Sequence, residues 1–144
     1  MILETTAAKE GSIAAENALP KKGRKMDYFT IPHAVFTSPQ VASVGLTEIQ
    51  AEEMGIRCRC STIPMTLVPK AVTINDTRGF IKMTIDNATE QILGVHILAP
   101  LAADMIHEGV LAVKYKLTLD DIIDMVHVFP TMSETIKLTA QSFK

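Results

Sequence analysis

The sequence predicts an α+β domain in which helices pack on an antiparallel sheet. Segments with strand-like character are grouped between residues 35 and 98, and segments with helical periodicity lie on both sides of this group. A hydrophobic fraction of 47% with 21% charged residues is typical of a chain that packs a globular core. At 144 residues, the chain is long enough for one such domain.

Residues 1–19 have the composition of a helix that is rich in small residues. Thr5 or Thr6 is placed to cap it, and the helix presents a narrow face suited to close packing with a neighbour, made of Ala7, Ala8, Gly11, Ala14, Ala15 and Ala18. Residues 20–25 then combine proline, glycine and positive charge, and we interpret them as a linker.

The strand-rich part of the chain starts after Tyr28. His33 lies in a connection without a motif, and residues 41–46 predict a short apolar strand. Thr47 and Gln50 form a capping box for a short helix, which Gly55 ends. Residues 56–64 alternate enough to predict a second strand.

Two further β-rich segments, residues 80–85 and 91–98, are separated by a loop of hairpin length. A kink at residues 68–71 is predicted before residues 72–74. One face of the first segment carries Ile81, Met83 and Ile85, and one face of the second carries Leu93, Val95 and Ile97.

The strongest helical periodicity covers residues 101–116, where Asp104, Glu108 and Lys114 lie outside an apolar stripe. The stripe consists of Leu101, Met105, Ile106, Gly109, Val110, Ala112 and Val113. Thr118 with Asp121 predicts the cap of a further short helix that runs through Met125.

The segment HVFPTMSE, residues 127–134, joins this region to the last helix. Pro130 favours an extended conformation for Phe129, and Thr131 with Glu134 has the spacing of a capping box. Two interpretations remain open: a helix N-terminus and nothing more, or an extended segment that presents His127 and Phe129 to another molecule.

The same eight residues resemble the HxHPTxxE signature of the pyridine nucleotide-disulfide oxidoreductases. In that family the histidine before the proline is the acid/base, is oriented by the glutamate, and reaches the partner subunit's flavin and disulfide. Here Phe129 occupies that position, while His127 matches the earlier histidine and Glu134 the glutamate. Because phenylalanine carries no transferable proton, the pattern disfavours a lipoamide-type thiol/disulfide mechanism.

Other segments resemble the C-terminal dimerisation domain of the same family over nearly all of residues 31–144. They are VFTSPQVASVGLTEIQAEEMGI, VPKAVTINDTRGFIK, ILGVHILAP and IKLTAQSF, and they are most similar to mercuric reductases, with dihydrolipoamide dehydrogenases next. The resemblance implies a dimerisation domain of the FAD/NAD-linked reductase type in residues 26–144. It makes residues 1–25 the last helix of an FAD-binding domain, followed by a linker.

The resemblance also implies a parent enzyme that uses FAD and NAD(P)H and reduces Hg(II) or a disulfide. We expect a homodimer whose chains also contain FAD- and NAD-binding domains, with Phe129 and Pro130 near the partner's flavin. The predicted contact between copies uses the helix at residues 101–116 and the last helix, with Ile136, Leu138 and Phe143.

The chain contains neither a G-x-G-x-x-G dinucleotide motif nor a C-x4-C redox motif. We therefore expect no bound cofactor, no catalytic residue and no activity in isolation. The alternative is a free-standing dimeric interaction module without catalysis. A leftover flavin-domain helix at the N-terminus favours the enzyme fragment.

Composition excludes several other classes. A net charge of −2 gives no electrostatic basis for binding nucleic acid, and no apolar run is long enough to span a membrane. The first residues lack a secretory pattern, so we expect a cytoplasmic protein. Cys58 and Cys60 suit a soft metal, but without further ligands we interpret them as ordinary strand residues and expect no metal site. His96 and His107 are interpreted as structural or surface residues.

Overall fold

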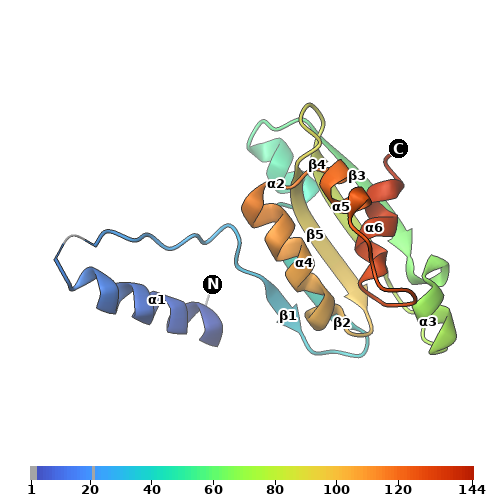
Figure 1. The fold of residues 1–144 in the computed structure, drawn as a ribbon, viewed down its shortest axis with the longest axis horizontal. Coiled ribbons are helices and arrows are strands. Elements are labelled where there is room, and N and C mark those ends of the chain that lie inside the picture. Colours follow the sequence, from blue (N-terminus) through green and yellow to red (C-terminus); the bar gives the residue numbers. More distant parts are fainter. Residues whose placement is uncertain (1–2, 21) are drawn as a thin grey trace.

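A computed structural model describes residues 3–20 and 22–144. One antiparallel sheet with the strand order β1-β2-β5-β4-β3 forms its centre (Figure 1). The predicted α+β class is confirmed. The strands are β1 (His33–Val35), β2 (Gln40–Gly45), β3 (Cys58–Pro64), β4 (Phe80–Asp86) and β5 (Ile92–Ala99).

Helix α1 precedes the first strand, α2 and α3 lie between strands, and α4, α5 and α6 follow the last strand. Helices α4, α5 and α6 cover one face of the sheet, while α1 lies to the side, at the end of an extended connection (Figure 1). The helices are α1 (Glu4–Asn17), α2 (Glu48–Glu53), α3 (Pro69–Thr73), α4 (Ala102–Tyr115), α5 (Leu119–Asp124) and α6 (Glu134–Gln141); Met65–Leu67 form a 3₁₀ turn. No helix in the described ranges is both long and apolar enough to cross a membrane.

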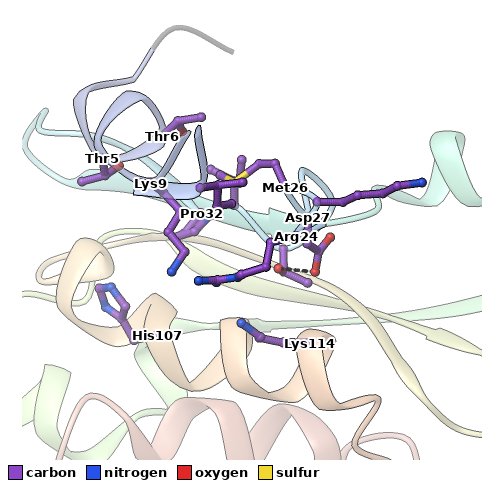
Figure 2. Close-up of a pocket in the computed structure, with 13 residues that line it drawn as sticks. Thr5, Thr6, Lys9, Arg24, Met26, Asp27, Pro32, His107 and Lys114 are labelled. Carbon is purple, nitrogen blue, oxygen red and sulfur yellow. Dashed lines mark hydrogen bonds between the residues drawn. The ribbon is translucent and has the colours of Figure 1, made fainter. Parts of the chain in front are cut away.

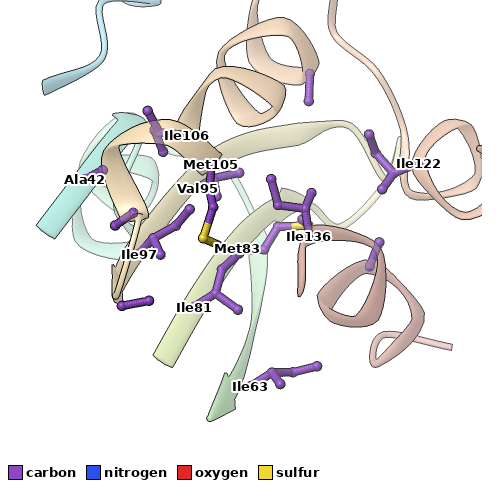
Figure 3. Close-up of a cluster of buried hydrophobic side chains, with 14 of the residues drawn as sticks. Ala42, Ile63, Ile81, Met83, Val95, Ile97, Met105, Ile106, Ile122 and Ile136 are labelled. Carbon is purple, nitrogen blue, oxygen red and sulfur yellow. The ribbon is translucent and has the colours of Figure 1, made fainter. Parts of the chain in front are cut away.

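The hydrophobic core lies between the sheet and helices α4, α5 and α6 (Figure 3). Alternation along β4 buries Ile81, Met83 and Ile85 on this face, as predicted. They pack with buried side chains of β5 and the covering helices, including Val95, Ile97, Met105, Ile106, Ile122 and Ile136. This core fixes where the chain leaves α5 and enters α6.

The predicted face of β5 is wrong at Leu93. Thr84 pairs with Gly94, but Ile85 pairs with Ile92, so Leu93 has no partner on β4 and forms a bulge. Ile92 therefore takes the buried position and Leu93 is only half-buried. A bulge shifts the alternation of side chains by one residue, which a strict period of two does not anticipate.

Local capping signals were reliable for two short helices. Thr47 and Gln50 form both hydrogen bonds of a capping box at α2, and Thr118 and Asp121 do the same at α5. Gly55 follows α2 with a φ of +74°, as expected for a glycine that ends a helix.

Two segments differ from their predictions. Residues 69–73 form helix α3 instead of a kink, because Pro69 occupies the first helical position, where its missing N–H is not needed. His33 begins strand β1, paired with Ser43, instead of lying in a connection.

Helix α1 forms within the predicted segment, but neither predicted threonine caps it. Leu3 is the N-cap and makes no side-chain hydrogen bond, while Thr6 is buried. Most of the small-residue face is exposed, including Ala7, Gly11 and Ala14. Residues 22–28 form neither helix nor strand. Residues 1, 2 and 21 of these predicted segments lie outside the described residues.

Candidate functional site

The chain between α5 and α6, residues 125–133, exposes an unusual set of apolar side chains. Val126 is 97% exposed, Val128 76% and Phe129 68%, and the neighbouring Met125 is also exposed. Exposed apolar groups that are this close together mark a surface that binds another protein or a ligand. We call residues 125–129 the apolar segment.

Hydrogen bonds fix the apolar segment at both ends. Lys137 Nζ donates to the carbonyl of Met125 at 2.6 Å, and Thr131 Oγ1 donates to the carbonyl of Val128 at 2.8 Å. Met132, which follows, is buried in the core. The apolar side chains are therefore held outward by a backbone that is tied to the domain.

His127 points the other way, toward helix α4. Its Nε2 atom lies 2.9 Å from Oε1 of Glu108, and only 8% of the histidine side chain and 20% of the glutamate side chain are exposed. Of the two interpretations of this segment, the one that presents both residues fails for His127, because the carboxylate of Glu108 holds the imidazole against α4. Phe129 alone is presented.

Glu108 was the residue that sequence reasoning missed. Because Glu108 lies outside the apolar stripe of the helix, the sequence placed it on the solvent-facing side. Its partner, His127, lies 19 residues further along the chain. No local spacing indicates such a pair. The position of His127 within an apolar run was the only indication in the sequence that its imidazole pairs with a carboxylate.

The predicted capping box at α6 is only half formed. The N–H of Glu134 donates to Thr131 Oγ1 at 3.3 Å, but the N-cap is Ser133, which makes no side-chain hydrogen bond. Oε2 of Glu134 is buried without a hydrogen-bond partner among the described residues. The carboxylate thus neither completes a box with Thr131 nor pairs with His127, whose partner is Glu108.

The predicted contact surface on the last helix is also wrong in part. Ile136 is fully buried, and Leu138 and Phe143 pack against the core. Exposed apolar side chains lie in the apolar segment, and the predicted surface on α4 also exposes Leu111 and Tyr115. Phe129 offers an aromatic ring without a proton to transfer, and His127 with Glu108 forms a mostly buried hydrogen-bonded pair.

A hollow lies between α1 and α4 and has a volume of about 330 Å³ (Figure 2). Figure 2 shows Lys9 reaching from α1 toward His107 and Lys114 on α4. Asp27 also lines it, where its carboxylate accepts from Thr30 Oγ1 at 2.8 Å. His107 is exposed, as predicted.

On the face of the sheet away from the core, His96 is satisfied by two hydrogen bonds. Nδ1 lies 3.1 Å from Ser43 Oγ and Nε2 3.1 Å from the carbonyl of Leu46. Burial lowers the pKa of His96 and favours its neutral form. The structural interpretation of His96 agrees with these contacts.

Comparison with protein families gives a match over most of the chain. The model described as the pyridine nucleotide-disulphide oxidoreductase dimerisation domain matches residues 31–140. A mercuric reductase from Lysinibacillus sphaericus is 41% identical over 137 residues, which cover 95% of this chain and 25% of that protein. A mitochondrial dihydrolipoyl dehydrogenase from Pisum sativum is 39% identical over 135 residues, with 94% and 27% covered. The chain spans about a quarter of the length of these relatives.

Solved structures agree with this match. The HOCl-induced flavoprotein disulfide reductase RclA from Escherichia coli superposes with a TM-score of 0.92 at 28% identity, covering 100% of this chain and 33% of that one. LpdA from Mycobacterium tuberculosis gives 0.91 at 25% identity, with 100% and 31% covered.

Proposed function

The chain belongs to the family of pyridine nucleotide-disulphide oxidoreductase dimerisation domains, and on this premise we propose that it forms the subunit contact of an FAD-dependent NAD(P)H oxidoreductase of the mercuric-reductase type. Residues 26–144 are the dimerisation domain, and residues 1–25 are a helix and linker that belong to the flavin-binding domain. The chain alone is inactive.

The observation that carries this proposal is the apolar segment. Val126, Val128 and Phe129 are exposed on a backbone that is anchored at both ends. Two-fold association requires a surface that is complementary to itself, and apolar side chains around an axis meet this requirement without pairing charges. Burying these side chains against a second copy removes their apolar surface from water.

Helix α1 supports the assignment of residues 1–25. Its small-residue face, with Ala7, Gly11 and Ala14, is exposed and narrow enough for close contact with another helix. A helix with so little buried apolar surface gains stability from such a neighbour. The flavin-binding domain of the parent chain would supply it.

The proposed role toward the flavin is limited to Phe129 and Pro130. Both are exposed beside the surface through which the second copy would bind, and an aromatic ring and a proline fit an apolar, planar cofactor. When bound, the flavin supplies electron transfer between NAD(P)H and the acceptor. Phe129 and Pro130 shape the entrance of the partner's active site and exclude water from it.

The acceptor proposed for the parent is Hg(II), with a disulfide as the second candidate. Phe129 stands where a proton-transferring histidine would serve a thiol, and it cannot exchange a proton. A soft metal ion that is already held by thiolates makes less demand on such a base, because its ligands lose their protons on binding. The similarity to mercuric reductases supports the same choice.

Light scattering of the purified chain at micromolar concentration tests the proposal. We expect a dimer, and we expect the double variant Val126→Ser/Phe129→Ser to be monomeric. Ile49→Ser is the matched control: Ile49 is 67% exposed, but it lies on α2. A monomeric wild-type chain, or a double variant that still pairs, would contradict the assignment of this surface.

The same preparation tests the proposed inactivity. We expect a colourless protein without stoichiometric FAD and with NADPH oxidation at background. A yellow protein that retains flavin through gel filtration would show that the chain holds the cofactor by itself.

A further inference from the structure

Cys58 and Cys60 share one half-buried face of strand β3. They are the only cysteines of the chain, and residues two apart on a strand point to the same side. Ile63 shows that the opposite side faces the core. Cys60 Sγ lies 3.4 Å from Thr84 Oγ1 on β4, and Cys58 Sγ lies 3.9 Å from the carbonyl of Glu48 on α2.

A positive charge accompanies the two thiols. Lys82 Nζ lies 2.6 Å from Oε2 of Glu48, and this hydrogen bond raises the pKa of Lys82, with a smaller contribution from Cys60 and Cys58. Lys82 pairs with Thr62 on this face of the sheet, two residues along β3 from Cys60.

The strand geometry favours a metal bridge over a disulfide. Alternate residues of a strand lie about 6.6 Å apart at Cα, near the upper end of the roughly 4.4–6.8 Å found in disulfides. Two metal–sulfur bonds of about 2.3 Å in a line separate the sulfur atoms by about 4.6 Å. Parallel side chains on a strand reach that separation without a change in the backbone, whereas an S–S bond requires them to converge.

We propose that Cys58 and Cys60 bind one Cu(I) ion as a two-coordinate dithiolate. Each thiol releases one proton to solvent, and the resulting complex carries one negative charge beside Lys82. Thiolates select soft ions such as Cu(I). Zinc requires more ligands, and no group of three or more His, Cys, Asp or Glu suited to a metal is found in residues 3–20 and 22–144.

The neighbouring imidazole does not complete a larger site. Both nitrogens of His96 are hydrogen-bonded, to Ser43 and to the carbonyl of Leu46. The site is also separate from the proposed subunit contact, because β3 carries the cysteines on the face away from helices α4 and α6. Its occupation and the pairing of two chains are therefore measured independently.

The test is anaerobic titration of the reduced chain with Cu(I) against a colorimetric Cu(I) chelator. We expect one Cu(I) per chain and an affinity that rises with pH, because binding releases protons. Cys58→Ser and Cys60→Ser should each weaken binding by at least about 100-fold, since loss of one arm of a chelate removes its effective concentration.

A relocated thiol provides the matched control. The double variant Cys60→Ser/Ser61→Cys keeps two cysteines but moves one to the opposite face of β3, so we expect it to bind as weakly as the single variants. Far-UV circular dichroism verifies that each variant is folded. Three outcomes would overturn the proposal: no Cu(I) uptake by the wild-type chain, equal uptake by the relocated variant, or one Cu(I) shared between two chains.

Discussion

The imidazole of His127 is fastened to helix α4 by Glu108, with 2.9 Å between Nε2 and Oε1. This contact turns one residue of the apolar segment inward while Phe129, two positions later, stays exposed. A histidine–carboxylate pair thereby sets the direction in which the exposed side chains of the segment project.

We expect this pair to contribute a measurable coupling energy. In a double-mutant cycle with His127→Ala and Glu108→Ala, the coupling should be about 1–2 kcal/mol, because both side chains are mostly buried and hydrogen-bonded. Urea unfolding of the four proteins at pH 7 measures it. A cycle with the exposed His107→Ala in place of His127→Ala should give a coupling near zero. Equal couplings in the two cycles would contradict a specific role for His127.

A second prediction separates the two candidate caps of α6. Thr131 Oγ1 accepts from the N–H of Glu134 and donates to the carbonyl of Val128, whereas Ser133 makes no capping hydrogen bond. Thr131→Ala should lower the free energy of unfolding by about 1 kcal/mol, and Ser133→Ala by less than about 0.5 kcal/mol. Urea denaturation compares them, and the reverse order would mean that Ser133 is the functional cap.

The third prediction concerns pH. Because burial lowers the pKa of His96 below its ordinary value of 6.5, the unfolded chain binds a proton at this residue before the folded chain does. The contribution of His96 to the free energy of unfolding is therefore fully present above pH 6.5. It is lost progressively as the pH falls below 6.5, with a slope of less than about 1.4 kcal/mol per pH unit. Urea unfolding between pH 7.5 and 5.5 should show a smaller decrease for His96→Gln than for wild type. The same slope in both proteins would exclude His96 as its source.

A fourth prediction concerns two glycines with positive φ. Gly79 has a φ of +103°, and a Cβ there would overlap the carbonyl of Leu98, whereas Gly55 has a φ of +74° and open space around it. Gly55→Ala should cost only the conformational penalty of about 1–2 kcal/mol. Gly79→Ala adds a clash with the backbone of β5 and should cost at least about 3 kcal/mol. Thermal unfolding ranks the stabilities of the two variants. Equal losses of stability would mean that the backbone of β5 shifts to accommodate the new side chain.

Most of the features that the sequence predicted well depend on residues a few positions apart. The capping boxes at Thr47 and Thr118 and the hairpin at residues 86–90 each depend on contacts within a few positions. The long helix α4 follows from its own periodicity. In each case the local preference agrees with the packing.

The failures occur where a distant contact or an irregular backbone decides. Leu93 loses its place in the core to a bulge, and His127 turns inward for a carboxylate on another helix. Pro69 is compatible with both a break and a helix start, and only the packing around α3 selects the second. At Thr131 and Glu134, the hydrogen bond from the N–H of Glu134 to the threonine hydroxyl is formed. The return hydrogen bond from the glutamate side chain is absent, because that side chain is buried elsewhere.

The strand order has a consequence for how the domain assembles. Strands β3, β4 and β5 pair with their neighbours in the chain, as β1 pairs with β2, but the sheet closes only where residues 40–45 meet residues 94–99. During synthesis, the β1–β2 hairpin therefore keeps the free edge of β2 unpaired until β5 has been synthesised. Closing so long a loop is the slow step expected for such a topology. Until it closes, the edge of β2 that later receives β5 is available to the strands of other chains, so aggregation during refolding should increase with protein concentration.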